Sequence, residues 1–339
     1  MDRTEFAKIL KSIIIPEGIS NEELNKVVFP ISKAILQMLP NSLFRYRCCD
    51  DKGLQMDAFK YDKIYAVTAD KFNDPYDTLV KFDIDNIKQV VDQFLNCDIL
   101  KEMQQYFKQG NDVPDNVKQF FSPEVIDNLK MQILTISNIK EIENNIEDYK
   151  KQLLSQIEFW FPIYVEMNRK FATIACFCET IQSIIMWSHY ADYHKGFALE
   201  YSSNELFEQQ NIGVFPVIYD DERYEAPFYL MWFWAQMMGF KIPKPDMLSD
   251  IKCVLHKSKQ WEYEKEWRMA NYLPRNIFEE SVSCISQKPI AIYYGCKISP
   301  ENKLRLHEIA KSKKIAEYDM YIDYSSSKYE MLYRPTNLI

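Results

Sequence analysis

The chain has 339 residues, a net charge of −8 and a hydrophobic share of 47%, as expected of a soluble globular protein with a substantial core. The acidic balance excludes a broad attraction to nucleic-acid or membrane phosphates, and no GxGxxG or GxxxxGKS/T loop for nucleotides occurs. Eight cysteines without CxxC spacing, together with a charged N-terminal segment, favour a cytoplasmic protein with free thiols.

The first 84 residues are predicted to contain helices followed by strands. Residues 4–38 have the pattern of two helices, and the second begins at a capping box formed by Ser20 and Glu23. The segments "SLFRYRCC" and "KIYAV" alternate like strands. The Asn, Asp and Pro of "TADKFNDPYD" then indicate a turn after the second strand.

The segment 85–170 differs in composition from the rest of the chain. Lys, Gln, Glu and Asn recur at helical spacing without strand signals, which predicts an inserted helical subdomain. We therefore predict N-terminal helices at 1–40, a core domain formed by 41–84 and 171–339, and the helical insertion between the two parts of that core.

The second half of the chain mixes strands with short helices. Strand patterns occur in "FATIACFC", "GFALEYS", "GVFPVIYDD", "EWRMANYL", "PIAIYYG", "IAEYDMYID" and "YEMLYRP". Helices are predicted for "QSIIMWSHYAD", for two segments within 226–258 and after the capping residue Ser299. Because strands and helices do not alternate one for one, this order predicts an α+β fold with a mixed, mostly antiparallel sheet.

The most apolar stretch is "APFYLMWFWAQMMGF" at 226–240. It is shorter than the about 20 residues that cross a bilayer, so we expect no membrane span and favour a buried core helix. A contact between two copies of the chain, or a segment lying at a membrane surface, stays open because Trp and Met are frequent at interfaces.

Arg45 and Arg47 lie two positions apart in "FRYRCC", so on a strand they share one face. Two cations on one face repel unless an anion lies between them, and guanidinium groups bind phosphate and carboxylate with two hydrogen bonds. The pattern therefore indicates either a phosphate-bearing ligand or pairing with a structural glutamate.

The turn "NDPYD" places acceptor side chains of Asn73, Asp74 and Asp77 close together after a strand. They either form the turn alone or contribute to a ligand site, and the acidic pair is compatible with Mg²⁺. In "MWSHYADYHKG", the spacing of the histidines is not one that binds zinc, which favours a hydrogen-bonding or substrate-positioning role. His189 and Tyr190 are candidates for that role, and Lys195 beside a glycine can reach a phosphate.

The segment "QWEYEKEWR" combines charge with aromatic rings. Strand alternation would place its carboxylates and a cation on one face, namely Glu262, Glu264, Glu266 and Arg268. The other face is aromatic and is expected to pack in the core. A row of carboxylates is unfavourable unless cations neutralise it or a pocket uses it. One carboxylate near a sugar C1′ stabilises an oxocarbenium ion and a second acts as base, whereas a salt-bridged strand is the structural alternative.

The strings "FNDPYD", "MWSHYADYHKG" and "YEKEWR" occur in an order that resembles the bacterial family of unknown function DUF2971. The resemblance covers about residues 42–310. It implies a soluble bacterial protein, and some members of the family lie near phage-defence genes. The family name itself implies no activity.

The order of a cation on a first strand, a hydroxyl group on a second and a glutamate on a late strand is similar to the ADP-ribosyltransferase superfamily. That resemblance implies a split sheet with a cleft that binds NAD. Arg45 or Arg47 would hold the NAD, Thr68 would support its nicotinamide side, and Glu264 or Glu266 would stabilise the transition state. The other candidates for cofactor binding are Asn73, Asp74, His189, Tyr190, Lys195 and Arg268.

Three functions follow from these patterns. The first is an NAD-dependent transferase of a phage-defence or toxin system, acting on a protein or nucleic-acid acceptor. The second is a non-catalytic nucleotide-sensing module, in which the arginine pair and Lys195 hold the ligand. The third is a metal-dependent hydrolase or nuclease using Asp74, Asp77 and Glu264. The first and third require these polar segments to meet at one cleft.

Overall fold

A computed structural model describes the chain except for residues 82, 95–96, 114–122, 136–138, 209–212, 227–228, 230–231, 233–243, 273–281 and 338–339. The strands are β1 (Ser42–Arg47), β2 (Lys63–Thr68), β3 (Ala172–Cys178), β4 (Phe197–Ser202), β5 (Val214–Pro216), β6 (Ile218–Asp220), β7 (His256–Ser258), β8 (Glu266–Tyr272), β9 (Val282–Ser286), β10 (Ala291–Tyr294), β11 (Ala316–Tyr321) and β12 (Leu332–Pro335). The helices are α1 (Arg3–Ser12), α2 (Asn21–Met38), α3 (Leu54–Lys60), α4 (Ile84–Phe94), α5 (Cys97–Lys108), α7 (Pro123–Thr135), α8 (Ile139–Asn168), α9 (Ile184–Tyr190), α10 (Ser203–Glu208), α12 (Ser249–Val254) and α13 (Pro300–Lys313), with short 3₁₀ helices η1 (Ala69–Lys71) and η2 (Lys259–Glu264).

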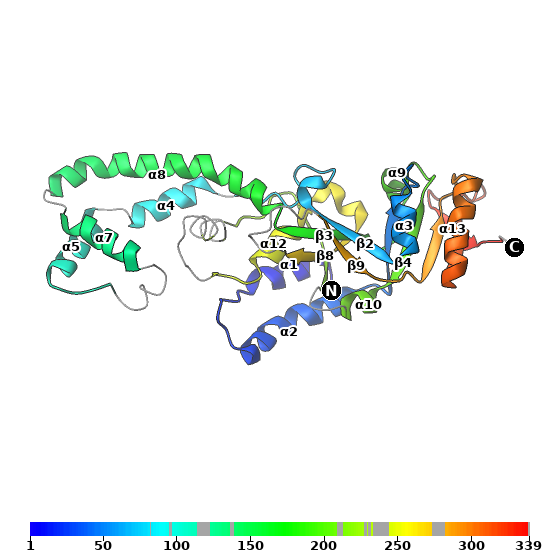
Figure 1. Cartoon of the computed structure of the whole chain (residues 1–339), viewed down its shortest axis with the longest axis horizontal. Coiled ribbons are helices and arrows are strands. Elements are labelled where there is room, and N and C mark those ends of the chain that lie inside the picture. The colour runs from blue at the N-terminus through cyan, green and yellow to red at the C-terminus, as the bar shows by residue number, and fades with distance from the viewer. Residues whose placement is uncertain are drawn as a thin grey trace.

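The large sheet has the strand order β12-β11-β10-β4-β1-β3-β2-β9, with β8 paired to β3 and β5 paired to β8. The pairings are antiparallel except that of β10 with β11, and a separate small sheet pairs β6 with β7 in parallel. Helices pack on this sheet from several sides (Figure 1). The predicted α+β fold with a mixed, mostly antiparallel sheet is therefore confirmed.

The sheet is split beside β3. One edge of β3 pairs with β8 along its whole length, from Ala172 to Cys178. The other edge pairs with β2 at Thr173 and Ile174, and with β1 at Cys178. Because β1 and β2 share this edge but meet it at different ends, they diverge between the two pairings. The predicted split therefore lies between β1 and β2.

Strand alternation places different side chains on the two faces at this split. Leu43 of β1 joins the main hydrophobic core with Phe59 of α3. Phe44 and Tyr46 point the other way and pack in a second cluster around the fully buried Trp187 of α9. The split is thus enclosed by α3 on one face of the sheet and by α9 on the other.

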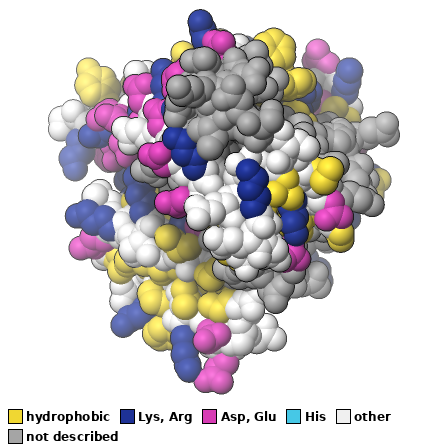
Figure 2. All heavy atoms as spheres, turned by 90° about the vertical axis from the view of Figure 1, so that its left-hand side faces the viewer, with side chains coloured by type: hydrophobic (Ala, Val, Ile, Leu, Met, Phe, Trp, Pro, Cys, Tyr) yellow, Lys and Arg dark blue, Asp and Glu magenta, His cyan; other side chains and the backbone are white. Residues whose placement is uncertain are grey.

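The helices α4, α5, α7 and α8 lie beside the sheet, on the left of Figure 1. Their residues fall within the segment predicted to be a helical insertion, and the division into domains stays a prediction. Figure 2 views this side and shows acidic and basic side chains interspersed with hydrophobic ones. None of the helices in the described ranges combines the length and the apolar character that crossing a membrane requires.

Several local predictions are confirmed. Ser20 and Glu23 form the capping box at the start of α2, and Ser299 caps α13. Two were wrong. "GVFPVIYDD" breaks at Val217 into β5 and β6, which belong to different sheets. The end of the helices predicted within 226–258 is instead the strand β7. Most of the apolar stretch 226–240 lies outside the described residues, so its predicted core or dimer role stays a prediction.

Candidate functional site

A cavity of about 200 Å³, here called the first cavity, opens at the split of the sheet. Its walls come from β1, β2 and β3, from the turn after β2, from α9 and from the segment between β7 and β8. The polar and charged side chains that line it are those of Arg45, Arg47, Asn73, Asp77, Tyr190, Lys257, Glu264 and Glu266. Segments separated by more than two hundred positions therefore meet here.

Arg45 and Arg47 have no carboxylate partner within 4.0 Å among the described residues. Arg45 donates from Nη2 to the backbone oxygen of Tyr65 across the split, at 3.0 Å, and its Nε lacks any partner in the described structure. Burial and the neighbouring Arg47 lower the pKa of Arg45 to about 9. The buried Arg45 and the half-buried Arg47 therefore carry positive charge that no acidic group of the described chain balances, in contrast to the structural-glutamate alternative.

The two arginines also line a further cavity of about 250 Å³, here called the arginine cavity, on the side of α3. Strand alternation directs their side chains toward that side, opposite to Tyr46. The guanidinium carbon of Arg45 lies 5.4 Å from the ring centre of Phe177, which belongs to the same side. Lys63 adds a third cation to this cavity, whose described lining contains no Asp or Glu.

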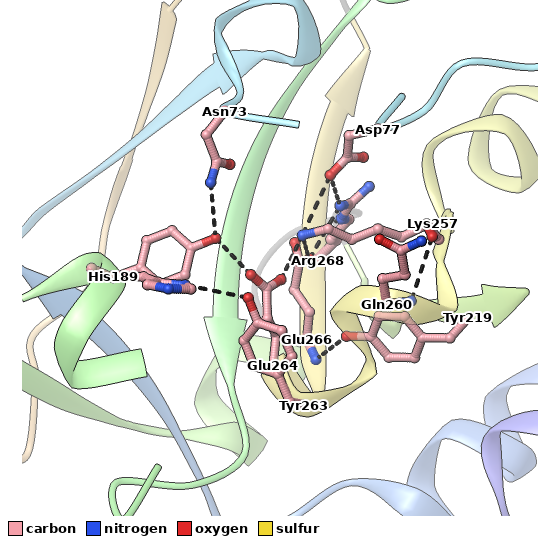
Figure 3. A network of polar contacts seen from close by, with 12 residues as sticks. Asn73, Asp77, His189, Tyr219, Lys257, Gln260, Tyr263, Glu264, Glu266 and Arg268 are labelled. Atoms are coloured by element: carbon pink, nitrogen blue, oxygen red, sulfur yellow. Dashed lines mark hydrogen bonds and ion pairs between the residues drawn. The ribbon is translucent and has the colours of Figure 1, made fainter. Parts of the chain in front are cut away.

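Two basic residues hold the carboxylates on the opposite side of the first cavity (Figure 3). Arg268 donates to Asp77 at 2.6 Å and to Glu266 at 2.7 Å. Lys257 lies 2.5 Å from Glu264, 3.0 Å from Glu266 and 3.5 Å from Asp77. All five side chains are at most 5% exposed. With three carboxylates and two cations, this ion network carries one negative charge in excess when every group is ionised.

Glu264 and Glu266 differ in protonation because their partners differ. Burial raises the pKa of Glu266, but Arg268 and Lys257 outweigh it and hold the pKa below its ordinary value. Burial raises the pKa of Glu264, and the attraction of Lys257 does not fully offset this effect. The surroundings of Glu266 therefore favour its ionised form, whereas burial favours the protonated form of Glu264.

The predicted strand alternation through "QWEYEKEWR" was wrong in its first half. Residues 259–264 form η2, and Lys265 follows in a left-handed conformation with φ of 45°. The strand β8 begins at Glu266, so alternation holds for Glu266, Trp267 and Arg268. Trp267 packs in the main core as predicted, while the carboxylates of Glu264 and Glu266 meet at Lys257 because the chain turns between them.

The helix α9 positions the Glu264 carboxylate. The hydroxyl group of Tyr190 donates to Glu264 Oε1 at 2.6 Å, and the side chain of Asn73 donates to the same tyrosine oxygen at 3.5 Å. His189 contacts the hydroxyl group of Tyr263 on η2, at 3.3 Å (Figure 3). His189 is thus a neighbour that links α9 to η2, and it is not among the residues that line the first cavity.

Besides His189, four candidate residues lie apart from the first cavity. Thr68 is buried and donates to Asp70, so the structure places its hydroxyl group in a local bond rather than at the site. Arg268 is fully buried within the ion network. Lys195 is exposed in the turn after α9. Asp74 lines a different cavity.

The metal-dependent alternative lacks a ligand cluster in the described ranges. Among those residues, no group of three or more His, Cys, Asp or Glu side chains is arranged to hold a metal ion. Asp77 is instead paired with Arg268, and Asp74 accepts a bond from the backbone of Tyr76. Of the three carboxylates named for this function, Asp77 and Glu264 meet at the ammonium group of Lys257, while Asp74 lines a different cavity.

Lys257 is the central residue that the sequence did not single out. It lies in β7, a segment that the sequence predicts to be the end of a helix, so strand alternation could not show which face its side chain occupies. Its carboxylate partners raise its pKa well above the ordinary value, although burial alone would lower it. A lysine in the apolar context of "VLHKSKQW" is the available signal that it is buried and paired.

Comparison with known proteins gave one match. The model of the family described as protein of unknown function, DUF2971, matches residues 186–269. No curated protein and no solved structure matches the chain. The matched residues include "MWSHYADYHKG" and "YEKEWR", two of the three strings that carry the resemblance, and they supply Tyr190, Lys257, Glu264 and Glu266 to the first cavity. The similarity to the DUF2971 family therefore lies in the segment 186–269.

Proposed function

We propose that the chain is an NAD-dependent enzyme of the ADP-ribosyltransferase type. Arg45 and Arg47 bind the phosphates of NAD at the split of the sheet, and Glu264 acts on its nicotinamide riboside. The observation that carries the proposal is that an arginine pair without acidic partners meets the Glu264 carboxyl group, whose pKa is raised, at one cavity. Such an arrangement suits a ligand that is anionic at one end and becomes cationic at the other.

The combined volume of the first cavity and the arginine cavity supports the binding of a nucleotide. Neither cavity alone reaches the roughly 300 Å³ at which small-molecule pockets begin, but together they do. They share Arg45, Arg47, Tyr65 and Val67 in their lining. Phosphates held by the two guanidinium groups would therefore leave the nicotinamide riboside in the first cavity and the remainder of the nucleotide on the side of α3.

The chemistry needs an ionised carboxylate beside the reacting ribose. The bond between ribose C1′ and the nicotinamide nitrogen breaks, its electron pair leaves with nicotinamide, and the ribose becomes an oxocarbenium-like cation. Glu264 accepts a hydrogen bond from the 2′-hydroxyl and stabilises that cation. A nucleophile of the acceptor then bonds to C1′ and loses its proton to solvent. The excess negative charge of the ion network favours this cationic transition state.

Glu264 is held for this role by two donors. Tyr190 donates to Oε1 and Lys257 to Oε2, which fixes the orientation of the carboxylate. Glu266 is less suited to the same role because Arg268 and Lys257 together give it three hydrogen bonds from charged donors. We therefore assign the catalytic carboxylate to Glu264 and a supporting role to Glu266.

A non-catalytic nucleotide-binding module is the second candidate. It is favoured by one observation, which is that Glu264 already bonds to Lys257 and so is partly neutralised before any ligand binds. In this function, Arg45 and Arg47 would still hold phosphates, but no bond of the ligand would break.

The test measures nicotinamide release from NAD⁺ by the purified chain, with and without a cell lysate as a source of acceptors. The wild-type protein is expected to release nicotinamide, and Glu264→Gln to reduce the rate at least about a hundredfold. Glu262→Gln is the matched control, because Glu262 is exposed on the same 3₁₀ helix. A wild-type protein that gains thermal stability with NAD⁺ but releases no nicotinamide would identify a binding module instead. Neither stabilisation nor release would refute both functions.

A further inference from the structure

A second cavity of about 340 Å³, here called the acidic cavity, lies on the other side of Lys257 from the first, and Lys257 lines both. Its walls come from the turn after β2, from the chain that follows β6 and from β7 with η2. The function proposed above uses none of the other residues that line it.

Three side chains of this lining are buried and incompletely satisfied. Asp74, Thr78 and His256 are 5%, 3% and 6% exposed. Asp74 Oδ2, Thr78 Oγ1 and His256 Nε2 have no hydrogen-bond partner among the described residues. A buried polar atom without a partner costs about 1–3 kcal/mol, so three around one cavity indicate a missing polar ligand.

The unsatisfied atoms call for hydrogen-bond donors. His256 Nδ1 lies 2.6 Å from the backbone oxygen of Lys252, and because a carbonyl oxygen only accepts, Nδ1 carries the hydrogen. Burial lowers the pKa of His256 to about 4, so the ring is neutral at neutral pH and Nε2 is an acceptor. Asp74 Oδ2 is likewise an acceptor. A ligand that satisfies both must present two or more N–H or O–H groups.

The charge and the rings around the cavity favour a cation. Asp220, Asp221 and Glu222 join Asp74 as carboxylates of its lining, against the two cations Arg223 and Lys257. Lys11 and Lys259 lie 3.8 and 3.9 Å from Asp220 and Asp221, and Lys257 is paired with the carboxylates of the ion network. The ring of Tyr224 stacks on His256 with a centroid distance of 4.4 Å, and Trp261 supplies an indole whose ring centre lies 4.9 Å from the Lys257 ammonium. Aromatic faces and carboxylates together attract organic cations, whereas they repel phosphates.

The backbone at the base of the cavity is also unusual. Thr78 has φ of 58°, a left-handed conformation that a β-branched residue rarely adopts. Strained backbone of this kind persists where surrounding structure imposes it, and it is concentrated at binding sites. It places the only polar atom of the Thr78 side chain among the buried groups of the lining without a partner.

We propose that the acidic cavity binds an organic cation through a guanidinium or primary ammonium group, with Asp74 and His256 accepting its hydrogen bonds. The three rim carboxylates attract the ligand, and Tyr224 and Trp261 enclose its nonpolar part. This site does not depend on the function proposed for the first cavity. If that function holds, the same group would be the natural end of an acceptor that approaches from beyond Lys257.

The test is isothermal titration calorimetry of the full chain at pH 7.5 with agmatine, which carries one guanidinium and one ammonium group. Agmatine is expected to bind saturably at one site, while the uncharged analogue butylurea does not bind. Asp74→Asn, which keeps the shape but removes the charge, should weaken agmatine at least about tenfold. Asp51→Asn is the control, because Asp51 is exposed and lines neither cavity.

Three results would overturn the proposal. They are the absence of saturable agmatine binding up to about 10 mM, equal binding of butylurea, and an unchanged affinity in Asp74→Asn. Circular dichroism establishes whether that variant is folded. If it is not, Glu222→Gln at the rim replaces it and should weaken agmatine about two- to threefold at low ionic strength, with the difference lost at high salt. An unchanged affinity in that variant would also count against the site.

Discussion

Two groups of buried charges face the same cavity, and their partners differ. Around Arg268 and Lys257, every cation contacts at least two carboxylates within 4.0 Å. Around Arg45 and Arg47, a backbone oxygen is the main acceptor and no carboxylate of the described chain is near. Charges that the fold neutralises internally act as scaffold, whereas charges left without a partner indicate where an external ion binds.

The substitution with the largest expected effect on stability removes one cation from the ion network. Arg268→Met should lower the free energy of unfolding by about 3–5 kcal/mol, because Asp77 and Glu266 would be left buried without their main partner. Urea denaturation measures the change. Arg305→Met is the control, since Arg305 is exposed and its loss should cost less than about 0.5 kcal/mol. Equal effects in the two variants would mean that the network is not a scaffold.

The second substitution removes an arginine without a carboxylate partner, at the split of the sheet. Arg45→Met should change the free energy of unfolding by no more than about 1 kcal/mol, because the lost bond to Tyr65 is offset by removal of a buried unpaired charge. The same variant should weaken NAD⁺ about ten- to a hundredfold, as expected for a lost charge-assisted contact to phosphate. Calorimetry and denaturation of one preparation measure both. A large loss of stability with unchanged NAD⁺ affinity would contradict the assignment.

The smallest test separates the two glutamates by pH. Because the pKa of Glu264 is raised above its ordinary value of 4.5, the folded chain keeps a proton that the unfolded chain has lost, and this group costs stability as pH rises through that window. The lowered pKa of Glu266 has the opposite sign. It contributes stability above pH 4.5 that is lost as pH falls toward the pKa of the folded state.

These opposite signs predict different pH dependences of stability for the two glutamine variants. Relative to the wild type, Glu264→Gln should gain stability as pH rises above 4.5. Glu266→Gln should instead lose stability as pH rises toward 4.5 and keep a constant deficit above it, and each change should be less than about 1.4 kcal/mol per pH unit. Denaturation between about pH 2 and pH 8 measures both. Nicotinamide release, where present, should fall on the acid side with a midpoint above 4.5 in the wild type. Parallel stability profiles for the two variants would show that their environments do not differ as described.

Much of the sheet could be predicted because its strands carry clear alternation. "SLFRYR" places Leu43 and Phe44 on opposite faces, and the structure has them in different clusters. The segment 259–264 was misread because its charged and aromatic residues also alternate, although they form a 3₁₀ helix that ends in a left-handed lysine. No glycine or proline marks that turn, so the sequence offered no signal for it.

The composition of the candidate site was partly predictable, and its pairings were not. Arg45, Arg47, Asn73, Tyr190, Glu264 and Glu266 were expected at one site, and they line one cavity. Pairing of an arginine at 45 or 47 with a structural glutamate was one of the alternatives, but the glutamates pair with Lys257 and Arg268. Arg268 bonds to Asp77, which is 191 positions away, and such a contact depends on how the strands are arranged rather than on local pattern.

The split beside β3 affects how the two parts of the sheet can move relative to each other. In the described sheet, β1, β4, β10, β11 and β12 are joined to β3 through a single residue pair, Phe44 with Cys178, while β8 pairs with β3 along its whole length. The guanidinium group of Arg45 spans the rest of the gap in place of a backbone bond. The two parts of the sheet can therefore move relative to each other about this pair without breaking a row of backbone hydrogen bonds. An anion that draws Arg45 away from Tyr65 would remove the hydrogen bond that connects the two sides of the split.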